Sequence, residues 1–357
     1  MTEKNVCLRG RGDFRVAATL KKLANELDLS VSTVSRILNG KGRFPEETRR
    51  RVLTAAKKLD YAPNLYARSL REQSYRVIGL IVPNVTNPYY SSILEKIEEE
   101  CRQAGYTLLI NVSNYIESRA KDYVDYLMAS RVGGMILASH DVDEEILHVL
   151  ERGLHVVSLN EHRPDVHFSW VSIDNRRAMF DLTQYMINLR HSNIACLYGD
   201  RENMDDITAE MRKTGYLECM KQNGLEVRED MLIRAGLTYT AGKEAAGRLI
   251  CRPQMPTAIV CHNNEVAAGA YDAFTEAGFE IPRDLSIGCF DSIIPTQVIG
   301  RRFTAIIQPL DAICHEAVQL LIREKTGEEK PKRVRFPYEF VKGETTQRCG
   351  EPTRSVP

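Results

Sequence analysis

Residues 19–40 read TLKKLANELDLSVSTVSRILNG and contain two helical patterns separated by a short break. In the first pattern, apolar residues recur at the i, i+3, i+4, i+7 spacing of an amphipathic helix, which Thr19 can cap. In the second pattern, Val34 and Ile37 share one face of a helix that Ser30 can cap. Two short helices joined by a tight turn predict a helix-turn-helix.

The outward face of the second helix is the surface that a helix-turn-helix presents to the major groove. An arginine there can donate two hydrogen bonds to guanine, and small side chains can contact other base edges or a thymine methyl. The predicted contacts are, to base edges, Val31, Ser32 and Arg36 and, to phosphates, Thr33, Asn39 and Lys41. The pattern of helices alone fits a small bundle with a solvated basic face equally well.

The charge distribution favours the DNA-binding interpretation. The whole chain has a net charge of zero, but residues 1–76 contain 17 Lys and Arg against 8 Asp and Glu, a net charge of +9, and the other residues carry −9. A basic head on an acidic body indicates that the head binds a polyanion.

The composition limits the other classes of protein. Hydrophobic residues make up 43% of the chain and charged residues 27%, as in an ordinary globular protein. No apolar run approaches the ~20 residues of a membrane-spanning helix, and the N-terminal sequence lacks the apolar core of a signal peptide. The nine cysteines are scattered without a C-x-x-C pair, which favours free thiols in a reducing cytoplasm over disulfides or a zinc site.

From residue 76 onward, short apolar runs alternate with amphipathic stretches of helical length. The first run is VIGLIVP at 77–83, and PYYSSILEKIEEECRQAG follows at 88–105. This alternation predicts parallel sheets covered by helices on both faces. Nine such runs over about 260 residues fit two α/β subdomains better than one sheet. Two-lobed α/β proteins bind small molecules between the lobes, at the carboxyl ends of the strands.

Side chains suited to a polyol ligand follow these runs. Tyr89 and Tyr90 come after the first run, Arg212 follows an acidic loop, and Asn264 and Asp291 follow later runs. Aromatic faces, an arginine fork and amide or carboxylate acceptors are the groups that recognise sugars. As an alternative, the tyrosines are core aromatics and the arginine pairs with a nearby carboxylate, at position 206 or 210.

Motifs for catalysis or metal binding are not found. His155, His162 and His167 have the spacing of no standard metal site. The sequence contains no G-x-S-x-G elbow, no phosphate-binding loop and no nucleophile beside a base. Asp174 and Asn175 follow an apolar run and are interpreted as a helix cap. We therefore expect no metal, no cofactor and no enzyme activity.

Three stretches, in order, carry a family resemblance: VSTVSRILNG, PEETRRRVLTAAKKLDYAPNLYARSL and IGLIVPNVTNPYY. They resemble the lactose-repressor (LacI) family of bacterial transcription regulators, and the similarity extends from about Val16 to about Arg348. The resemblance implies an all-α helix-turn-helix head with a hinge helix, joined to a two-subdomain α/β core like a periplasmic sugar-binding protein. The implied division is an N-terminal arm at 1–16, a DNA-binding domain at 17–62, a hinge helix and linker at 63–75, and an effector-binding and dimerisation core at 76–357. Within this core, the N-subdomain covers about 76–176 and 309–336, and the C-subdomain covers about 177–308 and 337–349.

The resemblance also assigns roles to single residues. Leu70 occupies the position of a hinge leucine that inserts into the minor groove, where an apolar wedge unstacks two base steps and bends the DNA. The segment around it is too short to be stable as an isolated helix, so it should fold only when two hinges pack together on DNA. The implied effector contacts are Tyr89, Tyr90, Asn160, Arg212, Leu237, Asn264 and Asp291. Two of them depart from the family pattern, because Asn264 replaces an aspartate and Leu237 replaces an aromatic residue of several relatives.

Together these observations predict a cytoplasmic, ligand-responsive repressor that binds a pseudo-palindromic operator as a homodimer, because each head reads half a site. The chain after Val341 has no heptads, so we expect no tetramerising helix. The predicted effector is a sugar or sugar derivative, and either induction or co-repression fits the same coupling. Two alternatives are a solute-binding protein of a transport system and a sugar-processing enzyme.

Overall fold

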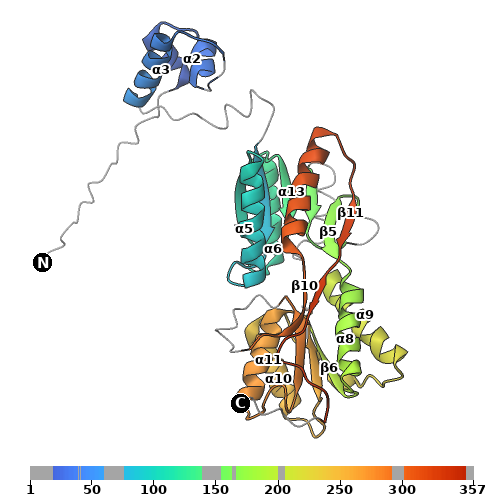
Figure 1. Ribbon diagram of the computed structural model, residues 1–357. Coiled ribbons are helices and arrows are strands. Elements are labelled where there is room, and N and C mark those ends of the chain that lie inside the picture. The colour runs from blue at the N-terminus through green and yellow to red at the C-terminus, as the bar shows by residue number, and fades with distance from the viewer. Residues whose placement is uncertain are drawn as a thin grey trace, which may run out of the picture. The chain divides into compact units, whose positions relative to one another are not determined.

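The computed structural model describes residues 19–38, 40, 42–59, 76–138, 154–162, 166–199, 206–291 and 301–350. The chain divides into two compact units, Met1–Tyr75 and Arg76–Pro357, which are described separately (Figure 1). The predicted contact residues Asn39, Lys41 and Leu70 lie outside the described residues.

The first unit contains a three-helix head. Its helices are α1 (Leu20–Leu27), α2 (Val31–Leu38) and α3 (Glu46–Lys58). The caps are those the sequence predicts: the Thr19 hydroxyl accepts from the backbone N–H of Lys22 at 3.2 Å, and the Ser30 hydroxyl accepts from that of Thr33 at 3.0 Å. The helices share one small core, made by Leu23, Ala24, Leu27, Val34, Ile37, Val52 and Ala56.

The second unit contains two lobes, each built on a six-stranded sheet. The sheet of the N-lobe has the order β11-β5-β4-β3-β1-β2 and is parallel throughout. Its strands are β1 (Val77–Val82), β2 (Thr107–Val112), β3 (Gly134–Leu137), β4 (Val156–Ser158), β5 (Ser169–Ile173) and β11 (Arg333–Phe336). Its helices are α5 (Pro88–Gln103), α6 (Glu117–Ala129) and α13 (Leu310–Thr326). Helices α5 and α13 lie side by side (Figure 1).

The sheet of the C-lobe has the order β12-β10-β9-β8-β6-β7, and only β12 is antiparallel to its neighbour. Its strands are β6 (Ile194–Tyr198), β7 (Leu232–Arg234), β8 (Ala258–Cys261), β9 (Ser286–Phe290), β10 (Thr304–Ile307) and β12 (Glu339–Val341). Helices α8 (Asn175–Asn188) and α9 (Ile207–Gln222) pack together, as do α10 (Tyr239–Ile250) and α11 (Asn264–Glu276). The two pairs lie on opposite sides of the sheet (Figure 1), and a 3₁₀ turn at Glu229–Met231 precedes β7.

The chain passes between the two lobes three times. It crosses from β5 to α8, returns from β10 to α13, and crosses again from β11 to β12. Each lobe is therefore assembled from separate stretches of sequence. The carboxyl ends of the parallel strands of both sheets face the region where these crossings occur, because a connection leaves a strand at that end.

All nine strands that the sequence predicts are present, and the two-subdomain α/β core is confirmed. Helix α10 and strands β7, β11 and β12 were not predicted. Helix α10 contains two glycines, and it packs so closely on α11 that a Cβ at Gly242 would lie 2.3 Å from the carbonyl oxygen of Val266. The three unpredicted strands are only three or four residues long and lie at sheet edges, where an apolar run is not required.

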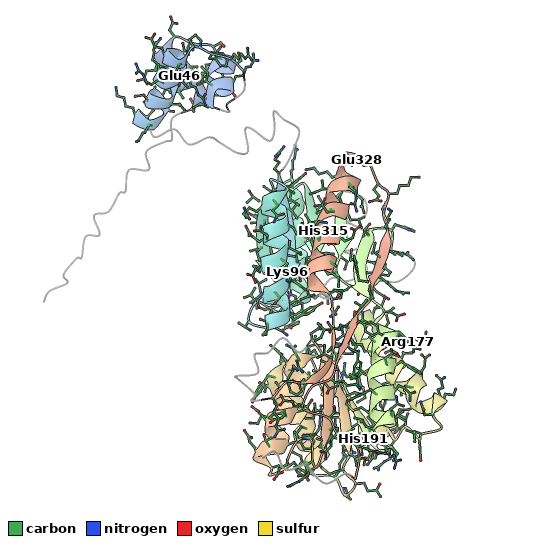
Figure 2. The ribbon with its side chains drawn as sticks, in the orientation of Figure 1. Glu46, Lys96, Arg177, His191, His315 and Glu328 are labelled. Atoms are coloured by element: carbon green, nitrogen blue, oxygen red, sulfur yellow. The ribbon has the colours of Figure 1, made fainter. Side chains whose placement is uncertain are left out.

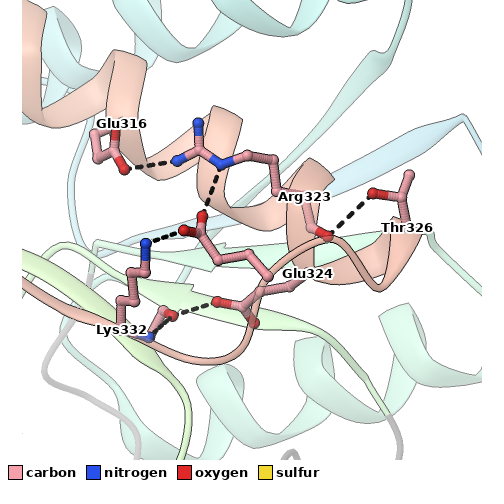
Figure 3. Close-up of polar contacts among 7 residues, drawn as sticks. Glu316, Arg323, Glu324, Thr326 and Lys332 are labelled. Atoms are coloured by element: carbon pink, nitrogen blue, oxygen red, sulfur yellow. Dashed lines mark hydrogen bonds and ion pairs between the residues drawn. The ribbon is translucent and has the colours of Figure 1, made fainter.

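Polar contacts between α13 and the segment that follows it fix the start of β11 (Figure 3). Arg323 forms ion pairs with Glu316 and Glu329, both at 2.7 Å. The Ser169 hydroxyl on β5 donates to the buried carboxylate of Glu324 and accepts from the backbone N–H of Lys332 at 2.7 Å. These contacts hold β11 in register beside β5.

A buried histidine, His191, connects several segments at one end of the C-lobe; it is labelled in Figure 2. Its Nδ1 lies 2.9 Å from the Thr257 hydroxyl, and its Nε2 lies 3.1 Å from the Ser286 hydroxyl and 3.0 Å from the Gln347 carbonyl oxygen. Burial lowers the pKa of His191. This contact set ties the C-terminal segment to two strands of the sheet, at the end of the lobe opposite the strand carboxyl ends.

Among the helices that the structure describes, none combines the length and the hydrophobicity required to cross a lipid bilayer.

Candidate functional site

In the head, one face of α2 is exposed, and this is the face predicted to contact DNA. Val34 and Ile37 are 0% and 4% exposed, whereas Val31 is 38% exposed, and Ser32 and Arg36 are also exposed. The three predicted base-reading side chains therefore share the outer face of α2. The Thr33 hydroxyl, a predicted phosphate contact, lies 2.8 Å from the Ser30 hydroxyl. Helix α3 adds a run of exposed arginines, Arg49, Arg50 and Arg51.

The second unit contains a polar cavity of about 50 Å³ where strand ends of the two lobes meet. All seven predicted effector residues line it: Tyr89, Tyr90, Asn160, Arg212, Leu237, Asn264 and Asp291. The other lining residues are Asn87, Tyr115, Ser172, Asn175, Asp206, Thr208, His262, Asn263 and Gln308. The structure thus brings together side chains that are more than 200 positions apart in the sequence.

Arg212 lies one turn and a half into α9 and is only 5% exposed. Its Nε donates to the Asn175 side-chain oxygen at 2.9 Å and its Nη1 donates to the His262 carbonyl oxygen at 2.5 Å. Its guanidinium carbon lies 3.7 Å from the centre of the Phe290 ring. Because the hydrogen bonds go to Asn175 and His262, they fix the direction of the arginine fork inside the cavity.

Asp291 follows β9 and is 4% exposed. Its backbone is in the left-handed region, with φ of 57°, a strained conformation for a residue other than glycine that is common at binding sites. Its Oδ2 accepts from the Gln308 amide at 2.8 Å. Burial raises the pKa of Asp291 to about 6, although the positive charge of Arg212 opposes this shift.

The aromatic pair begins α5. The Asn87 side chain caps this helix by accepting from the backbone N–H of Tyr89 at 2.9 Å, and Pro88 occupies the first turn. The rings of Tyr89 and Tyr90 meet edge to face, with centroids 5.1 Å apart. Burial is the main cause that raises the pKa of Tyr89, and the nearby carboxylate of Asp291 is the second. Both tyrosines pack on the core of the unit and also line the cavity, so the two interpretations of them are compatible.

Several buried polar atoms of the cavity have no hydrogen-bond partner. Asn264 is 1% exposed, and neither its amide nitrogen nor its amide oxygen is paired. The same holds for Nδ2 of Asn160 and for the hydroxyl of Thr208, which is 5% exposed. A buried polar group without a partner costs about 1–3 kcal/mol, so a bound molecule with donors and acceptors would be strongly favoured here.

The charges of the lining residues are few. Leaving His262 aside, the charged lining residues are Arg212, Asp206 and Asp291. The described lining includes no lysine. Asp206 also caps α9 by accepting from the backbone N–H of Ala209 at 3.0 Å. Among the described lining residues, the single arginine therefore lies near two carboxylates.

His162, one of the three histidines considered as metal ligands, is held by other contacts. His162 lies 2.8 Å from the Ser158 hydroxyl and packs edge to face on Phe168. In the part of the chain that the structure describes, no group of three or more His, Cys, Asp or Glu side chains could hold a metal ion.

Sequence analysis missed three lining residues whose positions resemble those that it found. Asn175 begins α8 and was interpreted as part of a helix cap, although it orients Arg212, and Thr208 lies in the first turn of α9. Gln308 directly follows β10, as Asp291 follows β9. The position after a strand was therefore the signal that could have found Gln308.

A two-lobed α/β core with a ligand cavity, on a chain that also carries a helix-turn-helix head, defines a class of ligand-responsive DNA-binding regulators. The model of bacterial regulatory proteins of the lacI family matches residues 19–64, and that of periplasmic binding proteins and sugar-binding domains of the LacI family matches residues 75–344. The chain belongs to the LacI family.

Named relatives agree with this assignment. The chain is 32% identical over 313 residues to the HTH-type transcriptional repressor CytR of Escherichia coli K12, which covers 87% of this chain and 91% of the repressor. It is 29% identical over 328 residues to the HTH-type transcriptional regulator DegA of Bacillus subtilis, covering 90% and 96%. These relatives are transcription regulators, so the alternatives of a transport protein and of an enzyme are rejected. The protein is a DNA-binding transcription regulator.

Solved structures show the same fold. The lac repressor dimer bound to operator and the anti-inducer ONPF has a TM-score of 0.78 at 22% identity, covering 92% of this chain and 99% of the repressor chain. A LacI family transcriptional regulator from Enterococcus faecium with bound ribose has a TM-score of 0.65 at 25% identity, covering 76% and 99%.

Proposed function

We propose that the protein is a repressor that acts in the cytoplasm, binds a pseudo-palindromic operator as a homodimer, and is controlled by a neutral sugar or sugar derivative bound between its lobes. In this proposal residues 17–62 bind DNA, 63–75 form the hinge, and 76–357 bind the effector and dimerise. The observation that carries the effector half is the cavity with unpaired buried polar atoms, above all the Asn264 amide.

The DNA half rests on the exposed face of α2. Arg36 can reach guanine in the major groove while Val31 and Ser32 contact neighbouring base edges. Because one head reads one half-site, high affinity requires two heads related by a two-fold axis. Asn39 and Lys41 as phosphate contacts and Leu70 as the minor-groove wedge remain predictions from the sequence.

The effector half rests on the chemistry of the cavity. Sugar hydroxyls both donate and accept, and Asn264 offers one donor and one acceptor that have no other partner. The Asp291 carboxylate can accept from neighbouring hydroxyls beside the Arg212 fork, and the tyrosine rings offer an apolar face to a sugar ring. The Enterococcus faecium regulator with bound ribose shows that a core of this fold takes a monosaccharide.

The charges favour a neutral ligand over a phosphorylated one. The arginine fork already donates to Asn175 and to the His262 carbonyl, and two carboxylates face the same space. A phosphate would meet these carboxylates, and the described lining residues include no lysine or second arginine to neutralise it, which is unfavourable in a buried site.

A thermal-shift panel tests this proposal. The panel contains D-ribose, D-galactose, cellobiose, cytidine and D-ribose 5-phosphate. A neutral compound at 100 times its Kd should stabilise the protein by about 2.7 kcal/mol and so raise the Tm. Operator binding measured with that compound then shows whether it induces or co-represses. The effector half is contradicted if only the phosphorylated compound raises the Tm.

A variant of Asn264 separates binding from folding. Because the amide has no partner, Asn264→Leu should leave the Tm of the free protein unchanged or raise it. The same change should remove the Tm increase produced by the neutral compound. The control is Asn223→Leu, whose amide hydrogen-bonds to Gln184 and to a helix carbonyl outside the cavity. A loss of Tm in Asn264→Leu as large as in Asn223→Leu would contradict the role of Asn264.

Binding of the neutral compound should weaken in acid. Hydroxyl donors stabilise the ionised form of Asp291, whose pKa is about 6, so protonation competes with binding. Affinity should be constant above pH 7 and fall by about tenfold per pH unit below pH 6. Calorimetric titrations from pH 5 to 8 measure this. Since His262 faces the same cavity, Asp291→Asn is the control: its profile should lose the fall, and a fall that persists would assign the effect to another group.

A further inference from the structure

The three connections between the lobes contribute differently to the cavity. The first, from β5 to α8, places Asn175 in its lining, and the second, from β10 to α13, places Gln308 there. The third connection runs from β11 to β12, and none of residues 333–341, all of which the structure describes, lines the cavity. It carries Arg335 instead, two residues before the chain leaves the N-lobe sheet at Pro337.

Arg335 holds a buried carboxylate, that of Glu161. Its Nε lies 2.7 Å from one carboxylate oxygen and its Nη2 lies 3.2 Å from the other, so the pair is bidentate. The side chain of Glu161 is 2% exposed, whereas that of Arg335 is 53% exposed. The arginine also lies over Trp170, with its guanidinium carbon 5.6 Å from the ring centre. A carboxylate this deeply buried needs its partner, because an unpaired charge is strongly disfavoured there.

Glu161 directly follows Asn160, which lines the cavity and whose buried amide nitrogen has no hydrogen-bond partner. The short segment around them, residues 159–162, leaves the end of β4. The backbone N–H of Leu159 donates to the Leu137 carbonyl at 2.8 Å, and that of Asn160 donates to the Ser158 hydroxyl at 3.1 Å. Arg335 ties the same segment to a strand 174 positions further along the chain.

The position of Arg335 depends on both lobes. In the N-lobe it stands in register with Ser172, itself a lining residue. Three residues later, the Tyr338 hydroxyl donates to the Asp181 carboxylate on α8 of the C-lobe at 2.5 Å. The strand that carries Arg335 is therefore anchored on each side of the crossing.

We infer that Arg335 is a positioning residue for effector binding: through its bidentate pair with Glu161 it fixes Asn160 in the cavity and couples the third connection between the lobes to effector occupancy. The inference has two parts. The first, which we call the positioning arm, is that Arg335 fixes Asn160, and it is independent of any ligand. The second, the effector arm, is that Arg335 couples the connection to effector occupancy, and it rests on the function proposed above.

Hydrogen exchange measured by mass spectrometry tests the positioning arm on the full chain without added ligand. Arg335→Lys keeps the charge but loses the two-point contact, and Glu161→Gln removes the buried charge without leaving an unpaired one. Both variants should exchange the amides of residues 159–162 about tenfold faster than the unaltered protein, with no change in the rest of the N-lobe or in the C-lobe. The matched control is Arg228→Lys, because Arg228 makes an equivalent bidentate pair with Asp230 outside the cavity.

The effector arm uses D-ribose as the probe or, if D-ribose leaves the Tm of the unaltered protein unchanged, the neutral panel compound that raises it. Both variants should bind the probe about tenfold more weakly, and Arg228→Lys should bind it as the unaltered protein does. If the residues act through the pair, the double variant should be no worse than the more severe single variant. The single tryptophan of the chain, Trp170, reports the same contact through its fluorescence, since it lies under the Arg335 guanidinium.

The outcomes separate the two proposals. Unchanged exchange at residues 159–162 in both variants overturns the inference, and so does faster exchange spread evenly over the whole core, which would mean a general loss of stability. Faster local exchange with unchanged probe affinity overturns the coupling to the effector. A protein that no panel compound stabilises, but whose variants exchange faster only at residues 159–162, retains the positioning role and loses the proposed sugar effector.

Discussion

Replacing Arg212 with methionine should abolish the response to the neutral effector while operator binding is retained. The variant keeps most of the side-chain volume but removes the donors held by Asn175 and the His262 carbonyl, and it leaves Asp291 without a cation nearby. Loss of charge-assisted hydrogen bonds of about 3 kcal/mol lowers affinity by at least about 100-fold. Isothermal titration calorimetry measures the binding, and fluorescence anisotropy with labelled operator measures the retained DNA affinity.

A surface arginine supplies the control for this experiment. Arg177 pairs with Asp181 at 2.9 Å on the outside of α8, and its side chain is 62% exposed (Figure 2). Arg177→Met should bind both effector and operator normally. If Arg212→Met still responds to the effector, the assignment of the cavity as the effector site is wrong.

Replacing Arg36 with alanine should lower operator affinity by about 10- to 100-fold, corresponding to roughly 1–3 kcal/mol for a bidentate contact with a base. It should also relax the base preference at one position of each half-site. Because Arg36 is exposed on α2, while the core is formed by the opposite face, the head should remain folded. Selection of binding sites from a randomised operator library measures the preference directly.

The matched variant is Arg49→Ala, on the basic surface of α3. A phosphate contact carries no sequence information, so this variant should weaken binding to all sequences alike and reduce its salt dependence. An Arg36→Ala variant with an unchanged base profile would contradict the base-reading role of Arg36.

The sequence predicted the elements whose physical cause is local. The first two helices of the head have clear apolar faces and hydroxyl caps, and the buried parallel strands are continuous apolar runs. Helix α10 gave no such signal, because its contact with α11 depends on the absence of side chains at Gly242 and Gly269. Strand β11 gave none either, since it alternates arginines with apolar residues, and its place at a sheet edge is decided by distant contacts such as that of Ser169 with Lys332.

The candidate site could be predicted where a residue follows a strand, as Asp291 does, or where the family resemblance marks it, as for Asn160 and Leu237. The residues that orient these side chains could not. Whether Asn175 only caps a helix or also holds Arg212 depends on how α8 and α9 pack, and whether Glu161 is exposed or paired with Arg335 depends on where β11 joins the sheet. Both contacts join residues far apart in the sequence, and no local pattern reports them.

The crossings of the chain between the lobes have a consequence for biosynthesis. The N-lobe sheet cannot be completed until Phe336 has left the ribosome, and the sheet of the other lobe waits for Val341. A polypeptide that ends before these strands has a complete DNA-binding head but an incomplete effector-binding core, in which apolar strand edges stay uncovered. Nonsense mutations that remove β11 or β12 should therefore behave as early ones do, yielding aggregated or degraded protein instead of a regulator that has lost only its effector response.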